Sequence, residues 1–162
     1  MFSDKIIRWE EHVAWFRQME ERRHILFFIC EYQCAPLGVV NFSRIDAMSR
    51  SAHWGFYLGP ESNPPGSGLM LGFLGLSHAF AQLEFKKIIG EVLASNPRSA
   101  TFHRKLGFAE DVSAAASVLK GGLQVNVQTF VLEAVRWFAQ LGDLEERALA
   151  SFLVAGDVSQ SG

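Results

Sequence analysis

The 162-residue sequence lacks the features that mark several large classes of protein. It has only two cysteines, Cys30 and Cys34, in and just after an apolar run, so we expect free thiols in a reducing compartment rather than a disulfide framework. No apolar run reaches the roughly 20 residues of a membrane span, and the first residues contain acids where a secretory signal would be apolar. These absences predict a cytoplasmic protein without a membrane partner.

The sequence also lacks an excess of charge of either sign. Fifteen lysines and arginines face 17 acids, which gives a net charge of −2. The sequence therefore shows no basic face that would bind nucleic acid or an anionic membrane. The five histidines are scattered without the spacing of metal ligands, so we predict no metal site. With 49% apolar residues, the composition is that of one globular domain with a substantial core.

Apolar patterning predicts an alternation of strands and helices. The clearest helix follows residue 68, because Leu69, Phe73, Leu76 and Phe80 recur on one helical face. In chain order the predicted elements begin with a helix over 7–16, a hairpin over 24–45, a strand over 51–59 and this helix. They continue with a strand over 86–94, a short helix over 96–107, strands over 108–112 and 123–135, and a helix over 143–155. We expect one mixed α/β domain over residues 1–142, followed by a C-terminal helix and flexible tail over 143–162.

The segment just before the predicted helix, Asn63-Pro64-Pro65-Gly66-Ser67-Gly68, concentrates proline and glycine. Glycines at a helix start let backbone N–H groups approach an anion, and the helix dipole adds to the attraction. Gly66 and Gly68 also have no side chain to keep a phosphate away. The segment thus predicts either a phosphate-binding loop or a turn that only joins a strand to a helix.

Two common phosphate-binding loops fit this segment poorly. A nucleoside-triphosphate loop would have lysine after its last glycine, where this chain has Leu69. A dinucleotide fingerprint would use Gly66, Gly68 and Gly72, which are one residue too widely spaced, although Glu91 on the next strand supplies the expected acid. A nicotinamide-binding protein is therefore the weakest of the alternatives.

The loop and a downstream run together resemble the GNAT family of N-acetyltransferases. The loop matches the family pattern Gln/Arg-x-x-Gly-x-Gly/Ala, with Asn63 in the place of Gln/Arg. The run "IIGEVLASNPRSATFHRKLGF" matches the family's strand, its asparagine, a helix and a closing Gly-Phe. The resemblance is specific over residues 62–108 and looser over 7–137. It implies a mixed, mostly antiparallel sheet, whose central parallel strand pair is splayed at the acetyl-CoA site, with helices on both faces.

Within that family, "AHWGFYL" and "HRKLGF" resemble one branch in particular. Its members are the UDP-4-amino-4,6-dideoxy-N-acetyl-β-L-altrosamine N-acetyltransferases of bacterial pseudaminic acid biosynthesis, a pathway that supplies flagellin glycosylation. The resemblance implies transfer of acetyl from acetyl-CoA to the 4-amino group of a UDP-linked amino sugar. An enzyme acting on a protein N-terminus is a close variant. A non-catalytic module that binds acyl-CoA or a partner is the alternative from another class.

The resemblance also implies which residues hold acetyl-CoA. Backbone N–H groups of the glycine loop would bind the pyrophosphate, the strand before it would pair with the pantetheine arm, and a backbone N–H near Leu58 would hold the thioester carbonyl. The residues implied to bind acetyl-CoA are Phe56, Tyr57, Leu58, Asn63, Gly66, Ser67, Gly68, Leu69, Asn96 and Ser99.

Two residues are implied to move protons. Glu91, the only acid in its apolar strand, would take the proton of the amine directly or through water; pairing with a neighbouring cation is the alternative. His103 stands where most of the family has the tyrosine that protonates the thiolate; a solvent-facing histidine is the alternative. The residues implied to border the acceptor are Arg44, His53, Trp54 and Tyr57.

The sequence starts almost inside the segment that matches the family's first helix. Either the start of the sequence is misassigned or the first family strand is missing, and its absence would leave a sheet edge and an apolar face exposed. A homodimer would cover both.

Overall fold

The computed structural model describes residues 25–32, 35–59, 63–114, 116–120 and 123–156. Its elements are β1 (Leu26–Tyr32), β2 (Ala35–Asp46), β3 (Ser51–Leu58), α2 (Ser67–Ala81), β4 (Lys87–Leu93), α3 (Pro97–Lys105), β5 (Ala109–Glu110), the 3-10 turn η1 (Val112–Ala114), β6 (Ala116–Lys120), β7 (Leu123–Glu133) and α4 (Ala134–Gly156). The predicted order is confirmed for β1 to β5, β7, α2, α3 and α4, whereas the strand β6 was not predicted. The helix expected over 7–16 lies outside the described residues.

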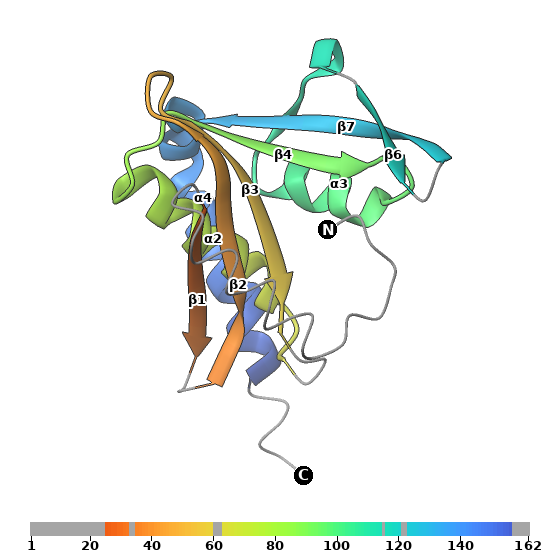
Figure 1. Ribbon diagram of the computed structural model, residues 1–162. Helices are drawn as coiled ribbons and strands as arrows, with labels where there is room; N and C mark the ends of the chain where they lie inside the picture. The colour runs from red at the N-terminus through yellow and green to blue at the C-terminus, as the bar shows by residue number, and fades with distance from the viewer. Residues whose placement is uncertain (1–24, 33–34, 60–62, 115, 121–122, 157–162) are drawn as a thin grey trace, which may run out of the picture.

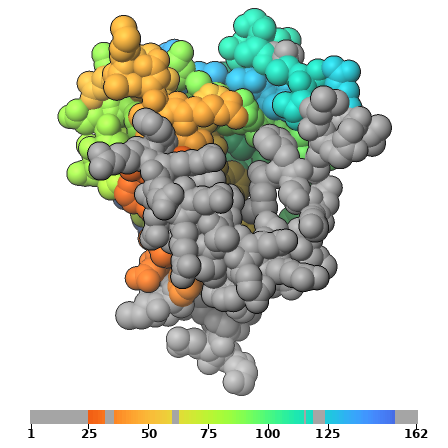
Figure 2. Space-filling model, in the orientation of Figure 1, coloured from red at the N-terminus to blue at the C-terminus, as the bar shows by residue number. Residues whose placement is uncertain are grey.

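Within the described residues, seven strands form one sheet in the order β1-β2-β3-β4-β7-β5, and β6 also pairs with β7. Every pairing among these strands is antiparallel except that of β3 with β4. The predicted mixed α/β fold with a central parallel pair is therefore confirmed. The β2–β3 turn and the η1–β6 segment project separately at the top of the space-filling view (Figure 2).

The parallel pair is short and then opens. The aligned residues end at His53 and Ile89, and the rest of β3 continues to Leu58 without a partner in β4. Figure 1 shows the two strands diverging from their shared end. Because a strand without a neighbour leaves its N–H and C=O groups unpaired, this divergence creates a polar edge in the middle of the sheet.

Helices α2 and α3 pack on the same face of the sheet. Trp54 on β3 is aligned with Phe42 on β2, so both point to one face, and Trp54 contacts His103 of α3. Val40, two residues from Phe42, lies on that face against Gly75 of α2. The buried core fills the space between the two helices and this face. Neither of these two helices lies on the opposite face, where the resemblance also implied a helix.

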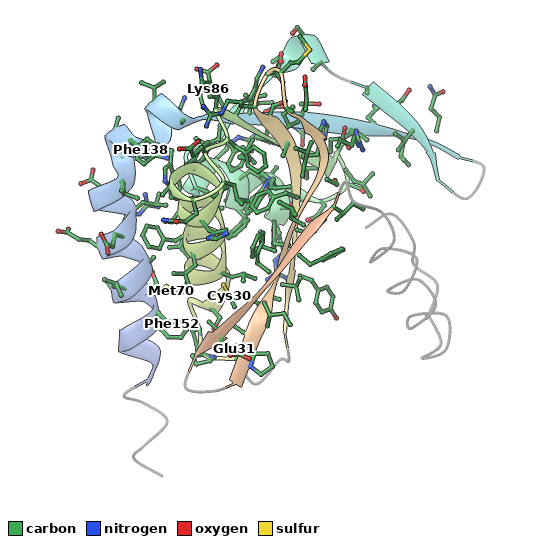
Figure 3. The ribbon with its side chains drawn as sticks, turned by 60° about the vertical axis from the view of Figure 1, so that its left-hand side comes forward. Cys30, Glu31, Met70, Lys86, Phe138 and Phe152 are labelled. Atoms are coloured by element: carbon green, nitrogen blue, oxygen red, sulfur yellow. The ribbon has the colours of Figure 1, made fainter. Side chains whose placement is uncertain are left out.

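Helix α4 lies antiparallel to α2. Its buried residues Trp137, Leu144, Ala148 and Phe152 form one stripe, and Trp137 stacks on Phe80 near the end of α2 with 5.7 Å between ring centroids. Met70, near the start of α2, lies beside Phe152 near the end of α4 (Figure 3). The expected boundary after residue 142 falls inside α4. No helix in the described part of the chain is both long and apolar enough to cross a membrane.

Candidate functional site

A cleft of about 800 Å³ lies where β3 and β4 separate. The consecutive residues His53 and Trp54 both line it, although they point to opposite faces of the sheet. The cleft therefore draws on both faces. Of the residues predicted for the site, those that line it are Arg44, His53, Trp54, Phe56, Glu91, Asn96, Ser99 and His103. Tyr57, Leu58, Asn63 and the glycine loop lie outside its lining.

One end of the cleft holds a bidentate ion pair between Arg44 and Glu91. Arg44 Nη1 donates to Glu91 Oε1 at 2.9 Å, and Nη2 donates to Oε2 at 2.8 Å. Arg44 has the positive φ of 47°, within the irregular register between Ser43 and Asp46. This turn of the backbone brings a guanidinium from β2 across β3 to a carboxylate on β4. Cation pairing, which the sequence left open for Glu91, is thus present, and any role of Glu91 as a base operates from within this pair.

His53 stands beside that ion pair. Its Nδ1 lies 3.6 Å from Glu91 Oε1 and is buried without a hydrogen-bond partner. Burial lowers the pKa of His53 below its usual 6.5, and Arg44 lowers it further, while Glu91 opposes both. The ring is therefore neutral at pH 7.

His103 is buried, with 3% of its surface exposed, rather than solvent-facing. Its Nδ1 lies 2.8 Å from the Ser99 carbonyl, which can only accept, and its Nε2 lies 3.2 Å from the Trp54 indole N–H, which can only donate. These partners fix a neutral ring with its proton on Nδ1. Burial lowers the pKa of His103, whereas its hydrogen bond to the Ser99 carbonyl raises that pKa. Burial is the larger effect, so the neutral form dominates at pH 7. In this arrangement the ring directs no N–H into the cleft.

The glycine loop forms the start of α2. Gly66 has a φ of +87° and precedes the helix without any side-chain cap. Both the N–H and the hydroxyl of Ser67 donate to the Pro64 carbonyl, so the Ser67 N–H is used within the loop. The next N–H groups, at Gly68 and Leu69, belong to the helix turn whose donors have no intrahelical acceptor. Asn63 Nδ2 donates to the Leu37 carbonyl at 2.7 Å and ties the loop to β2.

The free edge of β3 presents backbone groups toward the gap. The Gly59 N–H donates to the Leu37 carbonyl while Leu58 is aligned with Gly38, which makes Leu58 and Gly38 a non-hydrogen-bonded pair. The N–H and C=O of Leu58 therefore point away from β2, to the side that β4 has left. By the same alternation, those of Phe56 do so too.

Comparison with known proteins decides the family. The sequence matches the acetyltransferase (GNAT) domain over residues 3–109. The chain belongs to the GNAT acetyltransferase family. It is an N-acetyltransferase, and acetyl-CoA is its co-substrate. A search of curated protein sequences gives no match.

Solved structures share this GNAT fold. Spermidine N-acetyltransferase from Vibrio cholerae in complex with CoA and spermine superposes with a TM-score of 0.71 at 20% identity, covering 85% of this chain and 82% of that one. A point mutant of the same Vibrio cholerae enzyme gives a TM-score of 0.71 at 19% identity, over 86% of this chain and 83% of that one. At these identities the likeness shows the fold and leaves the acceptor open.

Sequence reasoning missed several polar residues of this GNAT cleft. Asn41 and Ser43 line it from β2, and Ser43 is aligned with His53 on the neighbouring strand. Their alternation with the buried Val40 and Phe42 is a period-2 signal that could have placed them on the His53 face. On α3, the polar residues missed are Arg98, Thr101 and Lys105, and the apolar Phe102 was missed as well.

Proposed function

We propose that this GNAT acetyltransferase transfers acetyl to the amine of a nucleotide-linked amino sugar, the 4-amino group of a UDP-linked sugar. The charge of the cleft is the observation that supports this acceptor. Among the described lining residues, Arg44, Arg98 and Lys105 are cations, and Glu91 is the only acid. Because Glu91 is already paired with Arg44, the cleft carries positive charge that an acceptor with phosphates would match.

A polyamine acceptor matches this charge poorly. The neighbouring Vibrio cholerae structure contains spermine, a polycation. A polycation is held best by several free carboxylates, and the described lining of this cleft offers one that is already bound by a guanidinium. The charge therefore favours the sugar nucleotide over a polyamine.

Acetyl transfer requires groups that hold the co-substrate. We propose that the Gly68 and Leu69 N–H groups bind the pyrophosphate at the start of α2 and that the Leu58 N–H holds the thioester carbonyl. The edge groups of Phe56 would hydrogen-bond the pantetheine arm, near Asn96 and Ser99. Asn63, whose amide is bound to Leu37, would act by holding the loop in place.

Two proton transfers complete the reaction. The amine must lose a proton at the end of the cleft that holds Glu91, and the departing thiolate must gain one. His103 could supply the second proton only as an imidazolium that has lost its bond from Trp54. We propose that His103 protonates the thiolate in that form, after a local movement of α3 away from Trp54.

The acceptor is tested by measuring CoA thiol release from acetyl-CoA with purified protein and three amines: the UDP-linked 4-amino sugar, spermidine, and a peptide with a free N-terminus. We expect thiol release with the sugar nucleotide at a kcat/KM at least tenfold above either alternative. Faster turnover of spermidine or of the peptide would contradict the proposed acceptor. Binding of CoA without transfer to any of the three amines would instead indicate a non-catalytic module.

A further inference from the structure

We propose that His53, rather than Glu91, accepts the proton of the acceptor amine, and that Glu91 and Arg44 are positioning residues behind it. This inference rests on the proposed acetyl transfer to an amine, but not on which amine it is. Its basis is the arrangement of three side chains, from β2, β3 and β4, at one end of the cleft.

Glu91 is poorly placed to collect a proton itself. Each of its carboxylate oxygens accepts a hydrogen bond from Arg44, in the fork geometry that makes such pairs strong and persistent. A proton arriving on either oxygen would remove the negative charge that the guanidinium holds. The Glu91 side chain is 27% exposed, and that of Arg44 is 61% exposed. Both carboxylate oxygens of Glu91 are therefore already engaged by donors on the side that faces Arg44.

His53 has the unused capacity that Glu91 lacks. Its buried Nδ1 has no hydrogen-bond partner, and the nearest acidic oxygen is Glu91 Oε1, at 3.6 Å. If Nδ1 carries the proton of the neutral ring, it can donate a hydrogen bond to this carboxylate once the two atoms move a few tenths of an ångström closer. That tautomer leaves Nε2 with a free lone pair, on a ring that lines the cleft. A carboxylate behind an imidazole in this way orients the ring and stabilises the imidazolium that forms.

The surroundings keep this imidazole neutral before it reacts. In the described part of the chain, the charged groups facing His53 are Arg44 from β2 and Glu91 from β4. Burial and Arg44 lower the pKa of His53, whereas Glu91 raises it. A ring that is neutral at pH 7 and has a carboxylate to stabilise its charged form can accept a proton.

The step balances as follows. The proton leaves the acceptor ammonium for Nε2 of His53, giving a neutral amine and an imidazolium. The amine nitrogen then forms a bond to the thioester carbonyl carbon, and the carbon–sulfur bond breaks with its electron pair on sulfur. The nitrogen gives up its second proton to water, which leaves a neutral amide, and the thiolate takes up one proton from His103. His53 finally returns its own proton to water, and His103 regains a proton from water.

The first test is the pH dependence of kcat/KM for His53→Asn, with His78→Asn as the matched control. His78 lies on α2 against Phe28 and does not line the cleft. At pH 7 we expect His53→Asn to lose between about 10²- and 10⁴-fold, the usual contribution of a positioned base. The defect should shrink as the pH rises toward the amine pKa, because more of the amine is then already neutral. His78→Asn should follow the wild type at every pH.

A His53→Asn defect that stays constant with pH would mean a merely structural role and would overturn the proposal. The same holds if Glu91→Gln shows the shrinking defect and His53→Asn does not. If the wild type prefers an amine other than the sugar, the acceptor proposed above fails, and the His53 comparison is made on that amine.

A second readout needs no turnover. The His53 ring is titrated by NMR in wild type, Glu91→Gln and Arg44→Gln protein. Glu91→Gln should lower the His53 pKa, and Arg44→Gln should raise it, following the signs of the two charges. A His53 pKa unchanged in both variants would mean that the three side chains do not act together, and would overturn the proposal.

Discussion

At the scale of single residues, Gly90 determines how His103 sits. A Cβ at position 90 would overlap His103 Nε2 and would approach Trp54 Nε1 to 3.0 Å. The imidazole of His103 therefore occupies the space that the side chain of any other residue at position 90 would fill. Trp54 donates to that same Nε2. Because Gly90 has no side chain, α3 can approach the sheet closely enough for this hydrogen bond between α3 and β3 to form.

Gly90→Ala should lower the free energy of unfolding by about 1–3 kcal/mol, the usual range for overpacking a tight core. Gly142→Ala is the matched control, because a Cβ there meets nothing within 4 Å. On an exposed part of α4, it should be neutral or stabilise by up to about 1 kcal/mol. Urea denaturation of both variants measures the difference. Equal stabilities for the two variants would show that His103 moves aside freely.

The contacts of single residues were also the hardest feature to predict from the sequence. Glu91 could be singled out as an acid within an apolar strand, but its partner Arg44 lies 47 residues earlier in the chain. Arg44 reaches Glu91 only because its backbone adopts a positive φ at an irregular register, which no periodic pattern signals. Likewise, the histidine at position 103 could be read as a proton donor, but its burial and its indole partner depend on tertiary packing.

At the scale of elements, the start of α2 separates structural from ligand-binding glycines. A Cβ on Gly66 would overlap the Ser151 backbone of α4, and the φ of Gly66 is positive, so that glycine is required by the fold itself. Gly68 differs, because the nearest atom to a Cβ there is Phe102 Cε2, at 4.0 Å. Packing therefore leaves room for a side chain at position 68.

Gly68→Ala tests whether a phosphate uses that room. We expect unfolding stability to stay within about 0.5 kcal/mol of wild type, since the added methyl group meets nothing closely. Affinity for CoA should fall at least tenfold, which corresponds to about 1.4 kcal/mol, because the methyl group blocks approach to the N–H groups. Calorimetric titration with CoA measures the loss, with Gly142→Ala again as control. Unchanged affinity would mean that the loop is only a connection.

Element boundaries were predicted where local signals are strong. Asn96 accepts from the Ser99 N–H, and Pro97 begins α3, as capping chemistry predicts. The strand expected to end at residue 135 ends at Glu133, and the helix expected to begin at residue 143 begins at Ala134. Val135 is 74% exposed and Trp137 is fully buried, the pattern of a helix with one covered face. The packing of Trp137 on α2 therefore favours a helix over a continued strand after Glu133.

At the scale of the whole molecule, the order of elements and the central parallel pair could be predicted, and the cleft could not. The order follows from periodicity and turn residues, and the parallel pair follows from the strand–loop–helix–strand unit. The cleft depends on where β3 and β4 part, which is set by packing across the sheet. The homodimer and the cytoplasmic location remain predictions.

Stability should fall as the pH drops below about 6.5. Burial lowers the pKa of both His53 and His103 from the 6.5 expected in the unfolded chain. Between the folded and unfolded pKa values the unfolded state binds more protons, so their contribution is full above pH 6.5 and is lost as the pH falls through the folded pKa. Each group adds a slope of at most about 1.4 kcal/mol per pH unit.

Urea midpoints at pH 8, 6 and 5 measure this loss. In His103→Gln, which cannot titrate at that position, the stability should change less steeply between pH 8 and pH 5. Equal slopes in the variant and the wild type would show that His103 titrates alike in the folded and unfolded chain.

The close packing of His103 against Gly90 also affects which substitutions evolution can accept. A larger residue at position 90 would displace the His103 ring. A smaller residue at position 103 would leave a cavity beside Gly90, and packing would then no longer require a glycine there. Neither change is easily accepted alone. Among homologues of this chain, we therefore expect positions 90 and 103 to vary together, although they lie 13 positions apart in the sequence.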